Sequence, residues 1–134
     1  MKLSGELESA SAFLQGAGLN VTSITPTLVE GFIVLGAESH TPWGIVHGGV
    51  YTTAVESAAS LGASAAVEDR GQIAVGVTNV TNFLRPMRNG RVNVRAEPIQ
   101  QGRTQQLWNV DITDENGRLV ATGQLRLQNV EADG

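Results

Sequence analysis

Polar and hydrophobic residues alternate along most of the second half of the chain, with the period of two that is typical of strands with one buried face. Three segments of similar length show the alternation clearly, and a more apolar segment precedes them. Turn-forming pairs separate the segments, so the pattern predicts an antiparallel meander with one dry and one wet face. The expected strands are 72–85, 91–100, 103–113 and 118–128, with turns at Asn89-Gly90, Gln101-Gly102 and Asn116-Gly117.

One long helix is expected in the first half of the chain. Residues 49–66 are rich in alanine, follow a glycine pair and end before the polar run that starts at Glu68. A curved sheet with a dry face needs a cover, and no other segment is long enough to supply it. The small side chains would let the helix lie close to the strands. The chain is therefore expected to be an α+β protein, with one long central helix wrapped by a curved antiparallel sheet.

The residues before this helix predict a short amphipathic helix and a hairpin. The run from Phe32 to Leu35 is apolar on both faces, which predicts a strand that is covered on both sides. We expect the short helix at 6–15 and the hairpin strands at 19–25 and 28–37, around Pro26.

Length and charge exclude several classes of protein. The 134 residues predict a single domain, 1–134, with no linker. A net charge of −4 disfavours nonspecific attraction to nucleic acid, and no apolar run approaches the roughly 18 residues of a membrane span. With no signal-peptide core and no cysteine, we expect a cytoplasmic protein without disulfides or thiol catalysis. His40 and His47 have no further ligands at useful spacing, so no metal is expected.

The candidate chemistry lies between His47 and Glu56. Gly48 and Gly49 at a helix start would leave backbone N–H groups bare at the positive end of the helix dipole, where an oxyanion is stabilised. Glu56 shares a polar helix face with Ser60 where the helix should be buried, and a buried charge is costly unless it is paired or functional. The simpler alternatives are an exposed glutamate and a histidine that only caps or packs against the turn.

Helix geometry also predicts a dimer. Eight residues of helical rise separate Gly48 from Glu56 by about 12 Å. Two groups that act on one carbonyl must both approach it within about 3–4 Å. The two residues therefore cannot serve the same carbonyl from one subunit, and we expect a homodimer in which Glu56 of one chain faces Gly48 of the other.

Three further motifs follow in order: Asn82-Phe83-Leu84-Arg85-Pro86, Gly102-Arg103, and the run from Asp114 to Ala121. Together with His47-Gly48-Gly49 and Glu56, they resemble the hotdog-fold acyl-CoA thioesterases over residues 20–130. The resemblance is to the 4-hydroxybenzoyl-CoA, phenylacetyl-CoA and 1,4-dihydroxy-2-naphthoyl-CoA thioesterases, and more closely to small actinobacterial members of that group. It implies a hotdog fold, dimers of dimers (a homotetramer), and no cofactor, since coenzyme A is part of the substrate.

The resemblance also implies roles for individual residues. Family members commonly carry Asn or Gln seven residues before the first glycine, and Thr41, with a shorter reach, occupies that position here. Glu56 would be the catalytic carboxylate, Gly48 the oxyanion donor beside Gly49, His47 a contact near the thioester carbonyl, and Ser60 and Thr78 hydroxyl groups of the site.

The leading hypothesis is an acyl-CoA thioesterase that acts on an aryl or medium-chain acyl group. Candidate side chains for the acyl pocket are Trp43, Tyr51 and Phe83, although plain packing would explain each of them. The main alternative is a noncatalytic acyl-CoA or aromatic-ligand binding module, which Thr41 favours. A dehydratase of the same fold is a third possibility, but the helix lacks its usual histidine and carboxylate pattern. The candidates for the coenzyme A phosphates are Arg85, Arg88 and Arg103.

Overall fold

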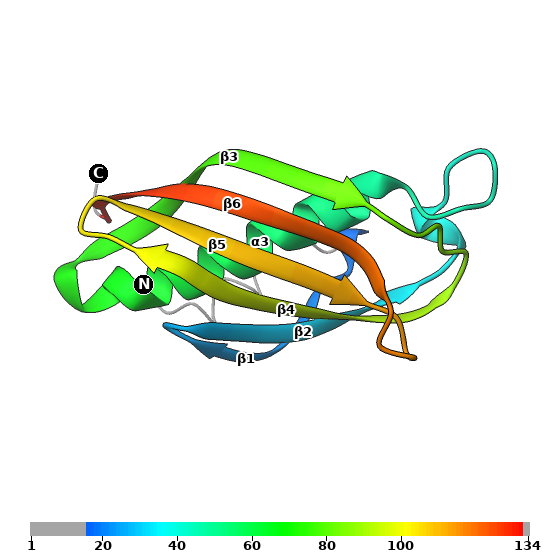
Figure 1. The fold of residues 1–134 in the computed structure, drawn as a ribbon, viewed down its shortest axis with the longest axis horizontal. Coiled ribbons are helices and arrows are strands. Elements are labelled where there is room, and N and C mark those ends of the chain that lie inside the picture. The colour runs from blue at the N-terminus through cyan, green and yellow to red at the C-terminus, as the bar shows by residue number, and fades with distance from the viewer. Residues whose placement is uncertain (1–15, 133–134) are drawn as a thin grey trace.

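The computed structural model of the protein describes residues 16–132 as a six-stranded antiparallel sheet that curves around one long helix (Figure 1). Helix α3 (Gly48–Val67) packs against the sheet, most extensively against β3. The short helix expected at 6–15 lies outside the described residues. The strands are β1 (Asn20–Thr25), β2 (Leu28–Leu35), β3 (Gln72–Phe83), β4 (Gly90–Gln101), β5 (Gln105–Thr113) and β6 (Leu119–Glu131), with 3₁₀ turns η1 (Ala37–Ser39) and η2 (Glu68–Arg70).

The strand order is β1-β2-β4-β5-β6-β3, so the predicted meander is correct only for its last three strands. The prediction that β3 adjoins β4 is wrong, because β3 pairs with β6 and forms one edge of the sheet. The N–H groups of Leu84 and Arg85 both donate to the Val120 oxygen (2.8 and 3.2 Å), and Pro86 has no N–H to begin a ladder with β4. The chain therefore stays beside β6 before it crosses to β4.

Small side chains bring α3 close to the sheet, as its composition predicts. A Cβ added at Gly62 would lie 2.7 Å from Trp108 Cζ3 and 2.9 Å from Val29 Cγ2. Trp108 is fully buried on β5, and its indole N–H donates to Gln106 Oε1 (2.9 Å). Gln106 Nε2 donates in turn to the carbonyl oxygen of Ala63 (2.9 Å). These contacts fix the second half of the helix against the centre of the sheet.

The outer face of the sheet has no helix over it within the described residues, so the prediction that the run from Phe32 to Leu35 is covered on both sides is wrong. Ile33 and Leu35 are buried beneath α3, but Val34 is 62% exposed. Phe32 lies under the Arg91 guanidinium, whose carbon is 3.9 Å from the ring centroid. No helix in residues 16–132 is long and apolar enough to cross a membrane.

Replacing Gly62 with alanine should lower the free energy of unfolding by about 1–3 kcal/mol, because the added carbon overlaps Trp108 and Val29 in a close-packed core. Gly16→Ala is the control, since nothing lies within 4 Å of a Cβ there, and it should change stability by less than about 1 kcal/mol. Urea unfolding followed by circular dichroism measures both. Equal stability of the two variants would show that close packing of Gly62 against Trp108 does not limit the size of the residue at this position.

Candidate functional site

His47 caps the N-terminus of α3. Its Nδ1 accepts a hydrogen bond from the Gly49 N–H (2.8 Å), and its carbonyl oxygen accepts one from the Val50 N–H (3.1 Å). An Nδ1 that accepts carries no proton, so the proton of the neutral ring is assigned to Nε2. His47 therefore caps the helix, and its ring is exposed and keeps one N–H available as a donor.

The N–H of Gly48 has no hydrogen-bond partner among residues 16–132. It lies at the positive end of the α3 dipole, where negative charge is stabilised. A Cβ at this position would lie 2.8 Å from Cε2 and Cζ of Phe83, so a larger residue here would push that ring aside. The helix thus begins with a bare amide beside an aromatic ring, an arrangement that suits a developing oxyanion.

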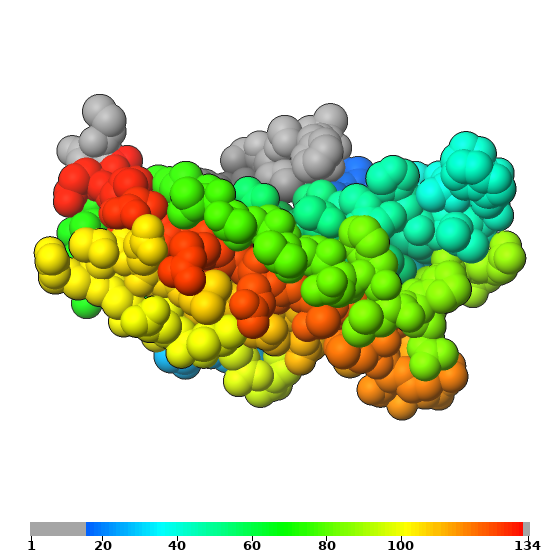
Figure 2. Space-filling model, turned by 45° about the horizontal axis from the view of Figure 1, so that its top comes forward, coloured from blue at the N-terminus to red at the C-terminus, as the bar shows by residue number. Residues whose placement is uncertain are grey.

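Glu56 is exposed in the single chain, so the expectation that it is buried is wrong. Its carboxylate lies beside Gly76 of β3: a Cβ added to Gly76 would stand 3.4 Å from Glu56 Oε2. No described strand lies beyond β3 to cover this side of the helix, because β3 is the edge of the sheet, visible as the green rim in Figure 2. The carboxylate is therefore held at the open edge of the molecule.

A bulge in β3 changes which side chains face the helix. The register against β6 shifts between Gly76 and Thr78, so Asn79 rather than Thr78 turns towards α3. Asn79 Nδ2 donates to the carbonyl oxygen of Thr52 (3.1 Å), and Thr81 Oγ1 donates to Asn79 Oδ1 (2.7 Å). Asn79 thereby joins β3 to the helical turn before Glu56. Sequence analysis missed this residue, because a bulge leaves no clear signal in the alternation.

The remaining predicted residues of the site are spread along α3 and the loop before it. Ser60 is half-buried one turn beyond Glu56. Thr41 is half-buried in the loop, and its hydroxyl accepts from the Trp43 N–H (3.3 Å). Because α3 is continuous, the start of the helix and Glu56 remain about 12 Å apart along its axis. One chain therefore does not bring Gly48 and Glu56 together.

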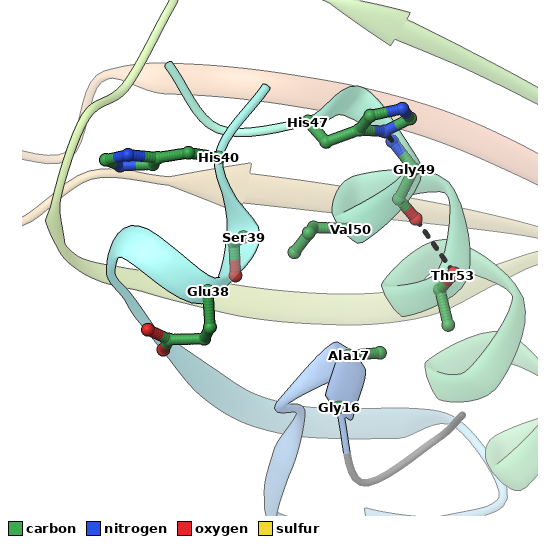
Figure 3. Close-up of a pocket in the computed structure, with 9 residues that line it drawn as sticks. All are labelled: Gly16, Ala17, Glu38, Ser39, His40, His47, Gly49, Val50 and Thr53. Atoms are coloured by element: carbon green, nitrogen blue, oxygen red, sulfur yellow. Dashed lines mark hydrogen bonds between the residues drawn. The ribbon is translucent and has the colours of Figure 1, made fainter. Parts of the chain in front are cut away.

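A cavity of about 540 Å³ opens beside the first turns of α3. Figure 3 shows the Val50 side chain pointing into the space between the helix and the segment of η1, while Glu38 and His40 point away from the helix. Of its lining, sequence analysis proposed only His47 and Gly49 as site residues. The lining residues are Gly16, Ala17, Glu38, Ser39, His40, His47, Gly49, Val50 and Thr53.

The three aromatic residues considered for a pocket lie elsewhere. Tyr51 is buried in the core, and this burial raises the pKa of its hydroxyl to about 12. Phe83 is half exposed beside Gly48, with its ring centroid 6.2 Å from that of Tyr51. Trp43 is 80% exposed on the loop before the helix. None of them lines the cavity beside α3.

The sequence matches the family model described as the thioesterase superfamily over residues 44–121, more than half of the chain, and this span includes the glycine pair and Glu56. The chain belongs to the thioesterase superfamily. Rv1847 of Mycobacterium tuberculosis is 52% identical over 91 residues, 66% of this chain and 65% of that protein, so the match spans slightly less than two thirds of the relative. The solved structure of that protein superposes with a TM-score of 0.87 and 42% identity, over 92% of this chain and 100% of the other.

Two further members of the superfamily carry thioesterase names. Thioesterase HI1161 of Haemophilus influenzae superposes with a TM-score of 0.86 and 30% identity, covering 98% of this chain and 92% of that chain. Proofreading thioesterase EntH of Klebsiella pneumoniae is 29% identical over 117 residues, 87% of this chain and 85% of that protein. The expected hotdog fold is confirmed by the likeness to these thioesterase structures.

The three arginines proposed to bind the coenzyme A phosphates do not lie together within one chain. Arg85 and Arg88 lie near the start of α3: the Arg85 N–H donates to the Val120 oxygen, and Arg88 Nη1 to that of Gly44. Arg103 lies at the opposite end of the sheet, in the turn between β4 and β5. Within residues 16–132, no three His, Asp or Glu side chains come close enough to hold a metal ion.

His47→Ala should lower the free energy of unfolding by about 1 kcal/mol, because it removes the acceptor for the Gly49 N–H. His47→Asn should stay within about 0.5 kcal/mol of the wild type, since the asparagine oxygen can cap the same turn. Urea denaturation of both variants provides the comparison. If asparagine is as destabilising as alanine, capping is not what the ring contributes to stability.

Proposed function

We propose that this protein hydrolyses the thioester bond of an acyl-CoA. The observation that carries the proposal is the bare N–H of Gly48 at the start of the helix that holds Glu56 at an open edge. Membership of the thioesterase superfamily supports thioester hydrolysis as the class of reaction. Support for coenzyme A as the thiol is at the level of the fold: smu.793 of Streptococcus mutans, 18% identical with a TM-score of 0.78, was solved bound to acetyl CoA.

The chemistry needs one carboxylate and one oxyanion donor. Glu56 takes a proton from water as the water oxygen bonds to the thioester carbon, and the Gly48 N–H stabilises the resulting oxyanion. The carbon–sulfur bond then breaks, and coenzyme A leaves as a thiolate, which needs no strong general acid. In the covalent variant a Glu56 oxygen attacks first, and water hydrolyses the resulting anhydride. His47 Nε2–H, beside Gly49 at the helix start, is placed to contact the same carbonyl region.

The site requires two copies of the chain. Glu56 is exposed, no strand of residues 16–132 pairs with the outer edge of β3, and exposed valines on β3 add an apolar surface beside that edge. Long apolar edge strands are seldom left open in stable proteins. A second copy related by a two-fold axis perpendicular to β3 would cover this surface, run the two helices antiparallel and bring Glu56 of one chain to Gly48 of its partner. The valines are Val75, Val77 and Val80, at 46%, 60% and 57% exposure. Homotetramer formation is proposed on the family resemblance alone.

The acyl group would enter the cavity beside α3. A volume of about 540 Å³ falls in the range of roughly 300–1,000 Å³ typical of small-molecule sites, and Val50 gives it an apolar wall. This supports an aryl or medium-chain acyl group. Arg85 and Arg88 are the proposed phosphate contacts, and Arg103 could join them only from another copy of the chain. Ser60 is proposed to hold water or substrate by its hydroxyl, whereas Thr78, which the bulge turns away from α3, has no such role within one chain.

The alternative is a binding module that retains acyl-CoA without efficient turnover. Thr41 favours this alternative. Its hydroxyl would have to replace the side-chain amide of the Asn or Gln that family members commonly carry there, but it already accepts a hydrogen bond from the Trp43 N–H (3.3 Å). The two functions differ in one measurable property, the release of thiol from bound substrate. A panel of aryl and aliphatic acyl-CoAs, with thiol release followed by absorbance, separates them.

With the best substrate of that panel, Glu56→Ala should lower kcat by at least roughly 100-fold while the circular dichroism spectrum stays unchanged, because the carboxylate acts mainly in the transition state. Glu68→Ala is the matched control, an exposed glutamate in η2 beyond the end of α3, and should keep wild-type turnover. Unchanged hydrolysis in Glu56→Ala would remove this carboxylate from the mechanism. Flat traces across the whole panel with wild-type protein would instead favour the binding module.

A further inference from the structure

The loop between His40 and Val46, which leads into the capped start of α3, is closed by backbone hydrogen bonds. The Thr41 N–H donates to the Ile45 oxygen (2.7 Å), and the Gly44 N–H donates to the Thr41 oxygen (3.0 Å). Gly44 has a φ of 77°, a left-handed conformation that favours glycine and makes the turn tight. The loop stands at one end of the molecule (Figure 1), and its geometry is fixed by its own hydrogen bonds.

Trp43 lies at the tip of this loop and is 80% exposed, more than any other large hydrophobic side chain in the described part of the chain. Its own N–H is held by the Thr41 hydroxyl (3.3 Å), so the backbone that carries the indole is constrained. An indole gains free energy when it leaves water, and a rigid turn that holds one in solvent offers a flat stacking surface. Core packing, one explanation considered for Trp43, is therefore wrong.

A cation is fixed beside the same tip. Arg88 Nη1 donates a hydrogen bond to the Gly44 carbonyl oxygen (3.3 Å). The Arg88 carbonyl oxygen accepts one from His40 Nε2 (2.6 Å). Within residues 16–132, no carboxylate pairs with Arg88, whereas Arg95 and Arg118 both form ion pairs. The guanidinium keeps further N–H donors in a fork that matches phosphate oxygens.

The pantetheine arm of coenzyme A is long enough to connect the helix start with the loop tip. The five residue-to-residue steps from Trp43 to Gly48 can span at most roughly 17 Å, and the pantetheine arm, with about a dozen bonds of ~1.5 Å, has a similar reach. The nucleotide of a coenzyme whose thioester lies at Gly48 can therefore reach the tip. That nucleotide combines a purine ring with several phosphates, the two chemistries that an exposed indole and a guanidinium bind.

We propose that Trp43 and Arg88 form the binding site for the nucleotide end of coenzyme A, with adenine stacked on the indole and a phosphate held by the guanidinium. The proposal rests on the proposed function for the identity of the ligand. It adds Trp43 as an affinity-determining residue that is remote from the reacting bond. A second copy of the chain packed on Trp43 is the competing occupant, and the experiment must distinguish the two.

The first test is fluorescence titration with adenosine 3′,5′-bisphosphate, which needs no turnover. The chain has two tryptophans, and Trp108 is fully buried, so quenching by a stacked adenine reports on Trp43. The wild type should show saturable quenching, which Trp43→Phe should abolish and Arg88→Ala should weaken about tenfold in Kd. Ile99→Ala, which removes an exposed apolar side chain on β4, is the control and should titrate as the wild type does.

The second test compares acyl-CoA with the matching S-acyl pantetheine, which lacks the nucleotide. Trp43→Ala should raise KM for acyl-CoA about tenfold with kcat retained, and should leave KM for the pantetheine thioester unchanged. Trp43→Phe should recover most of the loss, because a smaller ring still stacks. Equal KM changes for both substrates, or absent quenching, would overturn the nucleotide site. A fall in molecular mass by light scattering on Trp43→Ala would overturn it in favour of an interface between copies.

The bisphosphate titration is independent of the proposed hydrolysis. Wild-type protein that cleaves neither substrate would defeat the thioesterase proposal, while the bisphosphate titration would still decide whether Trp43 and Arg88 bind a nucleotide. Protein that cleaves both substrates with the same KM would keep the thioesterase proposal and defeat the nucleotide site.

Discussion

The rigid length of α3 determines how the candidate site can work. The helix runs without interruption for 20 residues, from Gly48, which follows the N-cap His47, to Val67. Gly48 and Glu56 lie on this one continuous helix, so the helical rise sets their separation along its axis at about 12 Å. The Gly48 N–H and the Glu56 carboxylate of one helix are therefore too far apart to act on the same thioester carbonyl. In the proposed dimer, the partner covers the edge of β3 and the exposed Glu56, and it supplies the missing half of each site.

The helix start shows how one local sequence meets two demands. Its first amides need partners for stability, and a catalytic donor must remain without one until substrate arrives. His47 accepts hydrogen bonds from the Gly49 N–H at Nδ1 and from the Val50 N–H at its carbonyl oxygen. The Gly48 N–H is left without a partner among residues 16–132. The Phe83 ring lies directly against Gly48 and would have to move for a larger residue there. The glycine pair is therefore explained by packing and capping as well as by chemistry.

The sequence predicts the elements better than their arrangement. The alternation around Val94, Val110 and Leu125 depends on local burial, so the strands and the single helix follow from it. The edge position of β3 depends on the hydrogen bonds of Leu84 and Arg85 to Val120, which are long-range contacts that no local pattern contains. The Gly76 bulge, the exposure of Glu56 and the contact of Asn79 with Thr52 have the same origin. The roles proposed for Ser60, Thr78 and the arginines stay predictions.

Mixing two inactive variants tests the shared site most directly. One carries Glu56→Ala and the other Gly48→Pro, and both carry Phe83→Ala, since a carbon at Gly48 would otherwise meet the Phe83 ring. Proline removes the donor N–H, is favoured at the first helical position, and matches the extended ψ of 132° at His47. After subunit exchange, equal amounts should recover about a quarter of the activity of the Phe83→Ala protein, because half of the dimers are mixed and each has one intact site. Activity that stays at the level of the separate variants, despite proven exchange, would contradict a site built from two chains.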